Sequence, residues 1–277
     1  MAYSDVTTVE WIVLIVLVSS CILYIIMQTR APNLEKYIKS NSSILRCSYL
    51  TTSLTIKQAG TPDSSFIEEV GNGDLIFFCG DTPGERTCRW CTGTMFSHVG
   101  MLFKEYDPES EKDVIYIWES DLGQKTKDGP RVIRLVDKLK KYHGQSYFMW
   151  RKLKGKAERP STKNIMEVVA KYKNYDFDDK MLSWWVTNPL LFFLHDMVKD
   201  EKKIFCSELI ALTMMSGNMN MIEEGEKRDN YPSLSSSYLA TSYSPNDFTQ
   251  PIIKGMRSDF SYGPQNFVDF SAFKKSK

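Results

Sequence analysis

Three residues far apart in the chain carry side chains that together could perform nucleophilic acyl chemistry. They are His98 in the segment SHVGM, Glu119 in IWESD and Cys206 in FCSEL. A thiol becomes a strong nucleophile when an imidazole takes its proton, and a carboxylate can orient that imidazole. These residue types, in the order His, acid and Cys, predict a thiol nucleophile with a base and an orienting acid.

The local sequence places the His and the acid on strands and the Cys at the start of a helix. Apolar runs at 96–103 and 113–120 predict two strands, one bearing His98 and the other ending near Glu119. His98 should share its face with a glycine that leaves room for a substrate backbone, and Glu119 should stay near the sheet without entering the core. Cys206 begins an apolar helical stripe, where free backbone N–H groups favour a thiolate and can stabilise an oxyanion.

Each of the three residues also has an ordinary structural interpretation. A cysteine after an apolar residue is more often a buried core thiol than a nucleophile. A histidine in a strand is usually structural, and a glutamate at a strand end is usually solvated. Their occurrence together with GDLIFF at 73–78 and SPNDF at 244–248 favours a functional site.

The rest of the body predicts further strands and helices. Strands are expected at 75–78, 131–136 and 145–150, helices at 162–173 and 206–215, and a loop at 80–94. This arrangement predicts an α+β fold, with an antiparallel sheet packed with helices.

Composition limits the remaining possibilities. Apolar residues make up 42% of the 277 residues and charged residues 25%, which is ordinary for a globular protein. The net charge of +1 gives no indication of a nucleic-acid partner, and none is expected. The six cysteines are too sparse and irregular for a small secreted disulfide scaffold. Free thiols in a reducing compartment are therefore expected.

The N-terminus contains an apolar stretch with the length of a membrane-spanning helix. Residues 9–28 carry one charge, at the edge of the stretch, and a spanning helix needs roughly 20 residues. A cleaved signal peptide is the alternative, but residues 1–10 hold two acids and no Lys or Arg. Basic residues follow the stretch, so the positive-inside rule places the body in the cytosol. The predicted organisation is a tail at 1–8, a transmembrane helix at 9–28, a stalk at 29–69, a domain at 70–250 and a tail at 251–277.

Six segments together resemble the circularly permuted NlpC/P60 group of papain-like thiol proteins. They are GDLIFF, SHVGM, the strand ending in Glu119, YDFDD at 175–179, FCSEL and SPNDF. The group includes YiiX-like bacterial and poxviral members, with lecithin:retinol acyltransferase as a more distant relative. In the group the His-bearing strand precedes the Cys-bearing helix, whereas in papain the cysteine comes first. The resemblance spans about residues 70–250 and implies a permuted papain-like fold.

The resemblance also implies roles for individual residues. Cys206 would be the nucleophile and His98 the base, with Glu119 as the third, polar member, a position whose identity varies across the superfamily. The candidate substrate-binding residues are Tyr175, where the group often has a tyrosine, and Ser97 and Ser207, which neighbour the His and the Cys. The group cleaves amide bonds or transfers acyl groups to or from lipids, and no cofactor or metal is implied.

Three segments stand outside this pattern. The apolar insert at 181–204 could dip into a membrane, cover the substrate or form a core helix, while Pro189 disfavours a second transmembrane helix. The loop at 79–91 holds Cys79, Cys88 and Cys91; a zinc site lacks an evident fourth ligand, so unpaired thiols or a redox pair are favoured. Nine basic residues at 137–163 could meet anionic headgroups or form a solvated rim.

The sequence therefore predicts a membrane-anchored cysteine hydrolase or acyltransferase that forms a thioester intermediate on a peptide or acyl-lipid substrate. The competing prediction is an inactive papain-like scaffold, such as a structural membrane protein of a large DNA virus, with its domain in the cytosol or the virion interior. The sequence gives no indication of the oligomeric state.

Overall fold

The structure of the chain is a computed structural model. It describes residues 44–48, 55–57, 64–92, 95–109, 111–122, 128–142, 147–155, 158–178, 202–216, 219–222, 240, 243–250, 252, 253 and 255–270, with four separate positions at 18, 19, 22 and 25. The apolar insert, up to residue 201, and most of the predicted transmembrane helix lie outside these ranges. None of the helices described is long and apolar enough to cross a membrane.

A nine-stranded sheet forms the centre of the described part of the chain. Its strands run in the order β3-β2-β1-β13-β8-β4-β5-β6-β7. Their bounds are β1 (Ile44–Ser48), β2 (Thr55–Lys57), β3 (Ser64–Ser65), β4 (Asp74–Phe78), β5 (His98–Asp107), β6 (Lys112–Asp121), β7 (Gly129–Arg134), β8 (Tyr147–Arg151) and β13 (Asn266–Asp269). All neighbouring strands pair antiparallel except β1 and β13, which are parallel.

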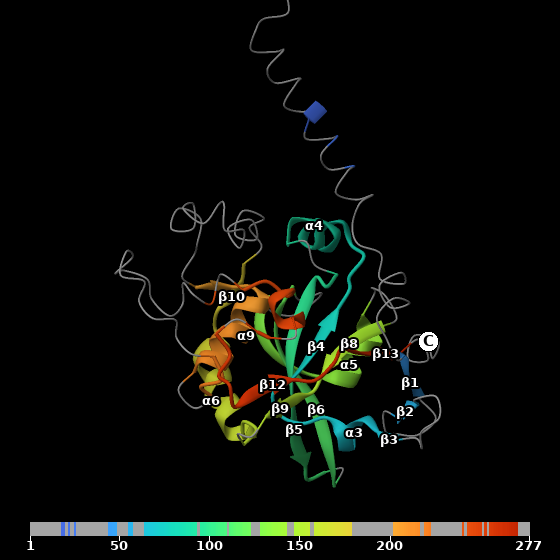
Figure 1. Ribbon diagram of the computed structural model, residues 1–277, viewed down its shortest axis with the longest axis vertical. Coiled ribbons are helices and arrows are strands. Elements are labelled where there is room, and N and C mark those ends of the chain that lie inside the picture. Colours follow the sequence, from blue (N-terminus) through green and yellow to red (C-terminus); the bar gives the residue numbers. More distant parts are fainter. Residues whose placement is uncertain are drawn as a thin grey trace, which may run out of the picture.

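Helices and two short strand pairs surround this sheet (Figure 1). The helices are α3 (Phe66–Glu69), α4 (Pro83–Thr92), α5 (Leu135–Lys141), α6 (Thr162–Tyr172), α9 (Cys206–Met215) and the short 3-10 helix η2 (Asp247–Thr249). The short pairs are β9 (Leu153–Gly155) with β12 (Phe260–Tyr262), and β10 (Asp176–Phe177) with β11 (Lys203–Ile204). The predicted α+β fold with an antiparallel sheet and helices is confirmed.

The two faces of the sheet bury separate hydrophobic cores. Side chains alternate along each strand, so Phe77 of β4 packs into the core that holds α6 and α9, while Phe78 packs into the core that holds α5. Leu209 of α9 and Leu139 of α5 are each fully buried in their own core. The sheet thus has a helix layer on each face, and a site at a strand end can draw side chains from both.

The stretch at 80–94, which the sequence predicts as a loop, contains a helix. Residues 83–92 form α4, and its start is fixed by a capping box in which the Thr82 hydroxyl accepts from Glu85 N at 3.3 Å while Thr82 N donates to the Glu85 carboxylate at 3.0 Å. Pro83 follows the cap at the first helical position, where proline is well tolerated. The sequence TPGE, with threonine at the cap and glutamate three residues later, is therefore typical of a helix start, which the loop prediction did not take into account.

The stretches predicted as stalk and tail both contribute strands. β1 to β3 come from residues 29–69, and β13 comes from residues 251–277. β13 lies between β1 and β8, and its Phe267 and Val268 are fully buried. β1 to β3 are too short for a clear periodicity, and β13 pairs only with strands that are distant in the chain.

Buried polar contacts tie two of the motif segments to neighbouring parts of the fold. Asp74 of GDLIFF is fully buried and accepts from Trp150 Nε1 at 2.9 Å, Leu153 N at 2.8 Å and Arg159 Nη1 at 2.6 Å. In the segment around SPNDF, Arg151 Nη1 donates to the carbonyls of Phe248 at 2.6 Å and Gln250 at 2.8 Å. Both contacts hold loops against the sheet, because buried polar groups need partners.

Candidate active site

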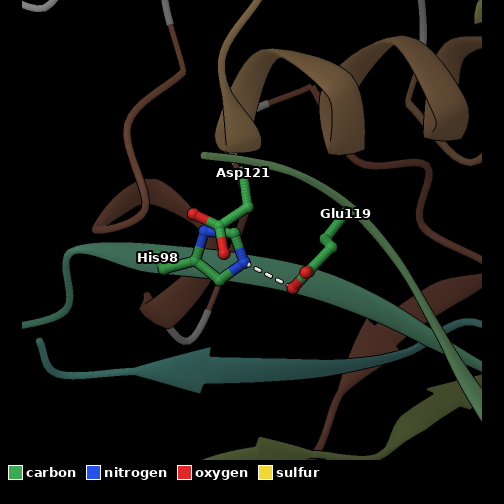
Figure 2. Close-up of side chains that lie close together, drawn as sticks. All are labelled: His98, Glu119 and Asp121. Atoms are coloured by element: carbon green, nitrogen blue, oxygen red, sulfur yellow. Dashed lines mark hydrogen bonds and ion pairs between the residues drawn. The ribbon is translucent and has the colours of Figure 1, made fainter. Parts of the chain in front are cut away.

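His98 and Glu119 meet on neighbouring strands at one end of the sheet. His98 is the first residue of β5, and Glu119 lies near the end of the adjacent antiparallel β6. The His98 Nε2 atom and the Glu119 Oε2 atom are 2.8 Å apart (Figure 2). Glu119 is fully buried, so the expectation that its carboxylate would stay out of the core is wrong.

The glycine beside His98 makes this contact possible. A Cβ atom at Gly100 would lie 2.6 Å from Ile117 Cγ2 and 3.5 Å from Glu119 Cβ. The space above Gly100 is therefore filled by β6 side chains, rather than left open for a substrate as the sequence suggested. The glycine lets Ile117 and Glu119 lie close over β5, which brings the carboxylate to the imidazole.

Cys206 approaches the same end of the sheet from α9. Trp118 Nε1 of β6 donates to Thr213 Oγ1 of α9 at 3.0 Å, and Ser120 Oγ donates to the carbonyl of Ile204, just before α9, at 2.6 Å. These contacts hold the start of α9 beside β5, where the Cys206 thiol lies 4.0 Å from the Ser97 carbonyl oxygen. The thiol therefore lies beside the residue that directly precedes His98 and β5.

Cys206 and His98 line one cavity of about 120 Å³. The cavity also receives Ser97, Ser207, Asp121 and residues from α4, with apolar walls formed by Leu122, Phe177, Phe205 and Pro245. A hydrogen bond with Cys206 is among the contacts that raise the pKa of His98. The Nε2 atom of His98 is engaged by Glu119, which leaves Nδ1 for this thiol. The arrangement places a thiol, an imidazole and a carboxylate that bonds the imidazole beside one cavity.

A charged cluster, which we define as Glu119, Asp121, Arg131 and Lys138, surrounds the histidine. Arg131 of β7 donates to Glu119 Oε1 from Nε at 3.0 Å and from Nη2 at 2.8 Å, and Lys138 Nζ of α5 lies 2.9 Å from the same oxygen. Both cations also reach Asp121 Oδ2, Arg131 at 3.0 Å and Lys138 at 2.6 Å. Two carboxylates are therefore matched by two cations next to His98.

The charged cluster sets the protonation of its members. Burial and Lys138 would each lower the pKa of His98, but Asp121 and Glu119 outweigh them and raise it to about 10. Burial opposes ionisation of Glu119, yet Lys138 and His98 hold its pKa well below the usual range. Burial would lower the pKa of Lys138, and the two carboxylates raise it instead. The site therefore holds an ionised carboxylate against an imidazolium.

The raised pKa of His98 predicts a loss of stability at alkaline pH. Folding favours the protonated form, so this contribution is fully present below about pH 6.5 and is lost as the pH rises toward about 10. Urea unfolding between pH 6 and 10 should show a steeper decline for the wild type than for His98→Gln. Parallel curves for the two proteins would contradict the assignment.

The three predicted substrate-binding residues have different surroundings. Ser97 and Ser207 line the cavity, but their hydroxyls also serve the backbone: Ser97 Oγ accepts from Gly80 N at 2.9 Å, and Ser207 Oγ donates to the Tyr243 carbonyl at 2.7 Å. Tyr175 is not among the residues that line the cavity and packs edge-on against Tyr172, with ring centroids 5.4 Å apart. Phe177, from the same YDFDD segment, lines the cavity instead.

The cysteines of the segment 79–91 have separate environments. Burial raises the pKa of Cys79 to about 12, and its sulfur accepts from Arg89 Nη1 at 3.1 Å. Cys88 is not disulfide-bonded and lines the cavity. The side chain of Cys91 lies outside the described part of the structure. The protonated thiol of Cys79 is a poor metal ligand, because metals bind thiolates.

Sequence reasoning missed Asp121, Arg131 and Lys138. Asp121 had a signal, because it lies two residues after Glu119 and so shares its face of the strand. Lys138 falls between the buried Leu135 and Leu139 of α5, at positions i+3 and i+4 from Leu135, so it belongs to the apolar stripe. It was instead grouped with the nine basic residues at 137–163. Arg131 could be placed only with the β6–β7 register, in which it pairs with Glu119.

Among the described residues, His98, Glu119 and Asp121 are also a group whose ligand atoms lie within 4.8 Å of one another. A metal ion there would need carboxylate oxygens that Lys138 and Arg131 already engage. The two side-chain cations supply the positive charge that the carboxylates require. The residues present do not fit a metal, and we derive no metal chemistry from them.

Solved structures that are similar to this chain include a bacterial metalloprotein. No family model matches the sequence, and no curated protein matches it. The crystal structure of the metalloprotein yiiX from Escherichia coli O157:H7 aligns with 56% of this chain and 71% of that chain, at 16% sequence identity and a TM-score of 0.37.

Proposed function

We propose that this chain is a thiol acyl hydrolase or acyltransferase with a permuted papain-like fold, in which Cys206 is the nucleophile. The observation that carries the proposal is the cavity shared by the Cys206 thiol and a His98 ring that Glu119 holds at 2.8 Å. The order of the elements, with the His-bearing β5 before the Cys-bearing α9, supports the permuted fold.

The reaction we propose proceeds through a thioester. The Cys206 sulfur attacks an acyl carbon, and the first backbone N–H groups of α9, which have no acceptor within the helix, stabilise the oxyanion. His98 then gives its proton to the leaving amine or alcohol as the carbon–heteroatom bond breaks. His98 next removes a proton from water or from an acceptor group, which attacks the thioester and releases the acyl product and the thiol.

The walls of the cavity support an apolar acyl group as the substrate. Phe177, Phe205 and Pro245 contribute apolar surface, whereas the Asp121 carboxylate accepts hydrogen bonds from Arg131 and Lys138. An acyl lipid or a peptide with an apolar side chain would both match this surface.

A membrane anchor at residues 9–28 is part of the proposal. The four described positions in that stretch are helical, and Val18, Ile22 and Ile25 are exposed there. They are spaced four and three residues apart, so they share one helix face. An exposed apolar face supports contact with lipid, and the basic residues after it support a catalytic domain in the cytosol or a virion interior.

Acyl transfer to the protein tests this function. The full chain, in detergent, is incubated with a p-nitrophenyl ester of a medium-length fatty acid, and its intact mass is measured. We expect one acyl group per chain, removed by neutral hydroxylamine and absent from Cys206→Ser. Equal labelling of the wild type and Cys206→Ser, or none in either, would overturn the proposal and leave a non-catalytic scaffold.

A further inference from the structure

The buried lysine of α5 is a charged group that the proposed reaction does not use. Lys138 is 6% exposed, and its ammonium lies 2.9 Å from the Glu119 carboxylate and 2.6 Å from Asp121 Oδ2. It also lies over the Phe78 ring, 5.5 Å from the centroid, and the Phe78 and His98 rings are 6.0 Å apart. A lysine in an apolar helix face, directed at the partner of the histidine, calls for an explanation beyond packing.

We propose that Lys138, together with Asp121, is a positioning residue of the Cys206 site: its ammonium holds Glu119 against His98 and offsets the negative charge beside the imidazole. This inference rests on the proposed function for its catalytic consequence. The arrangement of the charges around His98 stands independently of any reaction.

The contacts show how Lys138 can hold the carboxylate. Lys138 Nζ lies 2.9 Å from both oxygens of Glu119, Oε1 also receives Arg131, and Oε2 faces His98. Arg131 comes from the neighbouring strand β7, and Lys138 comes from α5 above the sheet. Two donors from different elements therefore fix the plane of the carboxylate, so that one oxygen is directed at the imidazole.

The charges show why both Asp121 and Lys138 are needed. The groups that act on His98 are Glu119 and Asp121 from β6, Lys138 from α5 and the Cys206 thiol from α9. Arg131 from β7 bonds the two carboxylates. With a neutral imidazole, the two carboxylates and two cations balance. Loss of Lys138 leaves an excess negative charge, which makes the imidazolium harder to deprotonate, and loss of the Asp121 charge does the opposite.

Opposite effects of two substitutions therefore identify this role. Lys138→Met keeps the length of the side chain and removes the charge, Asp121→Asn removes the opposing charge, and the double variant removes both. Lys140→Met is the matched control, because Lys140 is exposed on the same helix. Each full-length protein carries ¹⁵N-labelled histidine, and the His98 ring resonances are followed by NMR from pH 5 to 11.

We expect the pKa of His98 to rise by about one unit or more in Lys138→Met, to fall by a similar amount in Asp121→Asn, and to return toward the wild-type value in the double variant. The pH at which Cys206 alkylation changes should move in the same directions. Lys140→Met should leave both unchanged. If Lys138→Met does not fold, Asp121→Asn should still lower the pKa of His98, and the double variant should still bring it back toward the wild-type value.

Two results would overturn the inference. One is a folded Lys138→Met protein whose His98 titration and Cys206 profile match the wild type. The other is a displacement in the same direction for Lys138→Met and Asp121→Asn, which would indicate a general loosening of the site. The NMR titration needs no turnover, so a failed acyl-labelling experiment with the expected His98 shifts would reject the proposed function and keep this inference. Normal acyl labelling, together with a His98 titration that is the same in all variants, would reject this inference and keep the proposed function.

Discussion

Replacing His98 by alanine is expected to slow alkylation of Cys206 by iodoacetamide at pH 7 by about 100-fold or more. A thiol reacts through its thiolate, and an adjacent imidazolium stabilises that form. His98 shares the cavity with Cys206 and is held by Glu119 at 2.8 Å, so the wild-type thiol is paired with a fixed imidazole. Removal of the ring takes away both the proton acceptor and the positive charge.

The rate must be measured for each cysteine separately. Cys88 also lines the cavity, so peptide mass spectrometry is needed to assign the label. The same cysteines in urea-unfolded protein give the reference rate of an ordinary thiol. Cys79 serves as an internal control, because burial and its raised pKa should keep it slow in both proteins. A wild-type Cys206 no faster than the unfolded reference, with no change in His98→Ala, would show that the thiol is not activated.

Replacing Glu119 by alanine is expected to lower the free energy of unfolding by about 3–5 kcal/mol. The Glu119 carboxylate is fully buried and serves His98, Arg131 and Lys138 together. Its loss leaves three cations, Lys138, Arg131 and the protonated His98, to share the Asp121 carboxylate, and Lys138 is only 6% exposed. An uncompensated buried cation is far more costly than a lost surface ion pair.

Urea unfolding at pH 7 measures this effect. Asp113→Ala is the control, because Asp113 is an exposed acid on the same strand and should change stability by less than about 0.5 kcal/mol. The pKa of Glu119 is held below its usual value, so its contribution is present above about pH 4.5 and is lost as the pH falls further. The wild type should therefore lose more stability on acidification than Glu119→Ala. Equal unfolding energies for the two alanine variants would contradict the role of Glu119 in the charged cluster.

Local periodicity was enough to predict the central strands and two helices. The strands expected at 75–78, 96–103 and 113–120 correspond to β4, β5 and β6, because alternating and continuous apolar runs reflect burial. The helices expected at 162–173 and 206–215 correspond to α6 (Thr162–Tyr172) and α9 (Cys206–Met215). α6 begins with a serine cap, in which Ser161 Oγ accepts from Asn164 N at 3.2 Å.

Elements that depend on distant partners could not be found in this way. Strand β13 carries few residues and gains its place from β1 and β8, whose sequences lie more than a hundred residues away. The strand predicted at 131–136 includes the first two residues of α5, because the apolar run of β7 continues directly into Leu135 and Val136. The sequence therefore groups Lys138 of α5 with the basic residues at 137–163, which could meet anionic headgroups or form a solvated rim.

The residues of the site likewise fall into two groups, those that the local sequence indicates and those whose role depends on distant parts of the chain. His98 and Cys206 could be selected because each lies in a short segment whose neighbours have a recognisable pattern. Arg131 and Lys138 could not, because their role depends on the β6–β7 register and on the packing of α5 over the sheet. The sequence therefore indicated which groups could react, whereas the charges that control them required the fold.

The most direct test of the central claim is the position of an acyl group on the protein. Full-length chain is quenched in acid shortly after mixing with the activated ester, and the adduct is located by peptide mass spectrometry. We predict a hydroxylamine-sensitive acyl group on Cys206, formed quickly in the wild type and at least about 100-fold more slowly in His98→Ala. An adduct spread over Cys88 and other residues, or formed on Cys206 at the same rate without His98, would contradict the claim that these residues form a catalytic site.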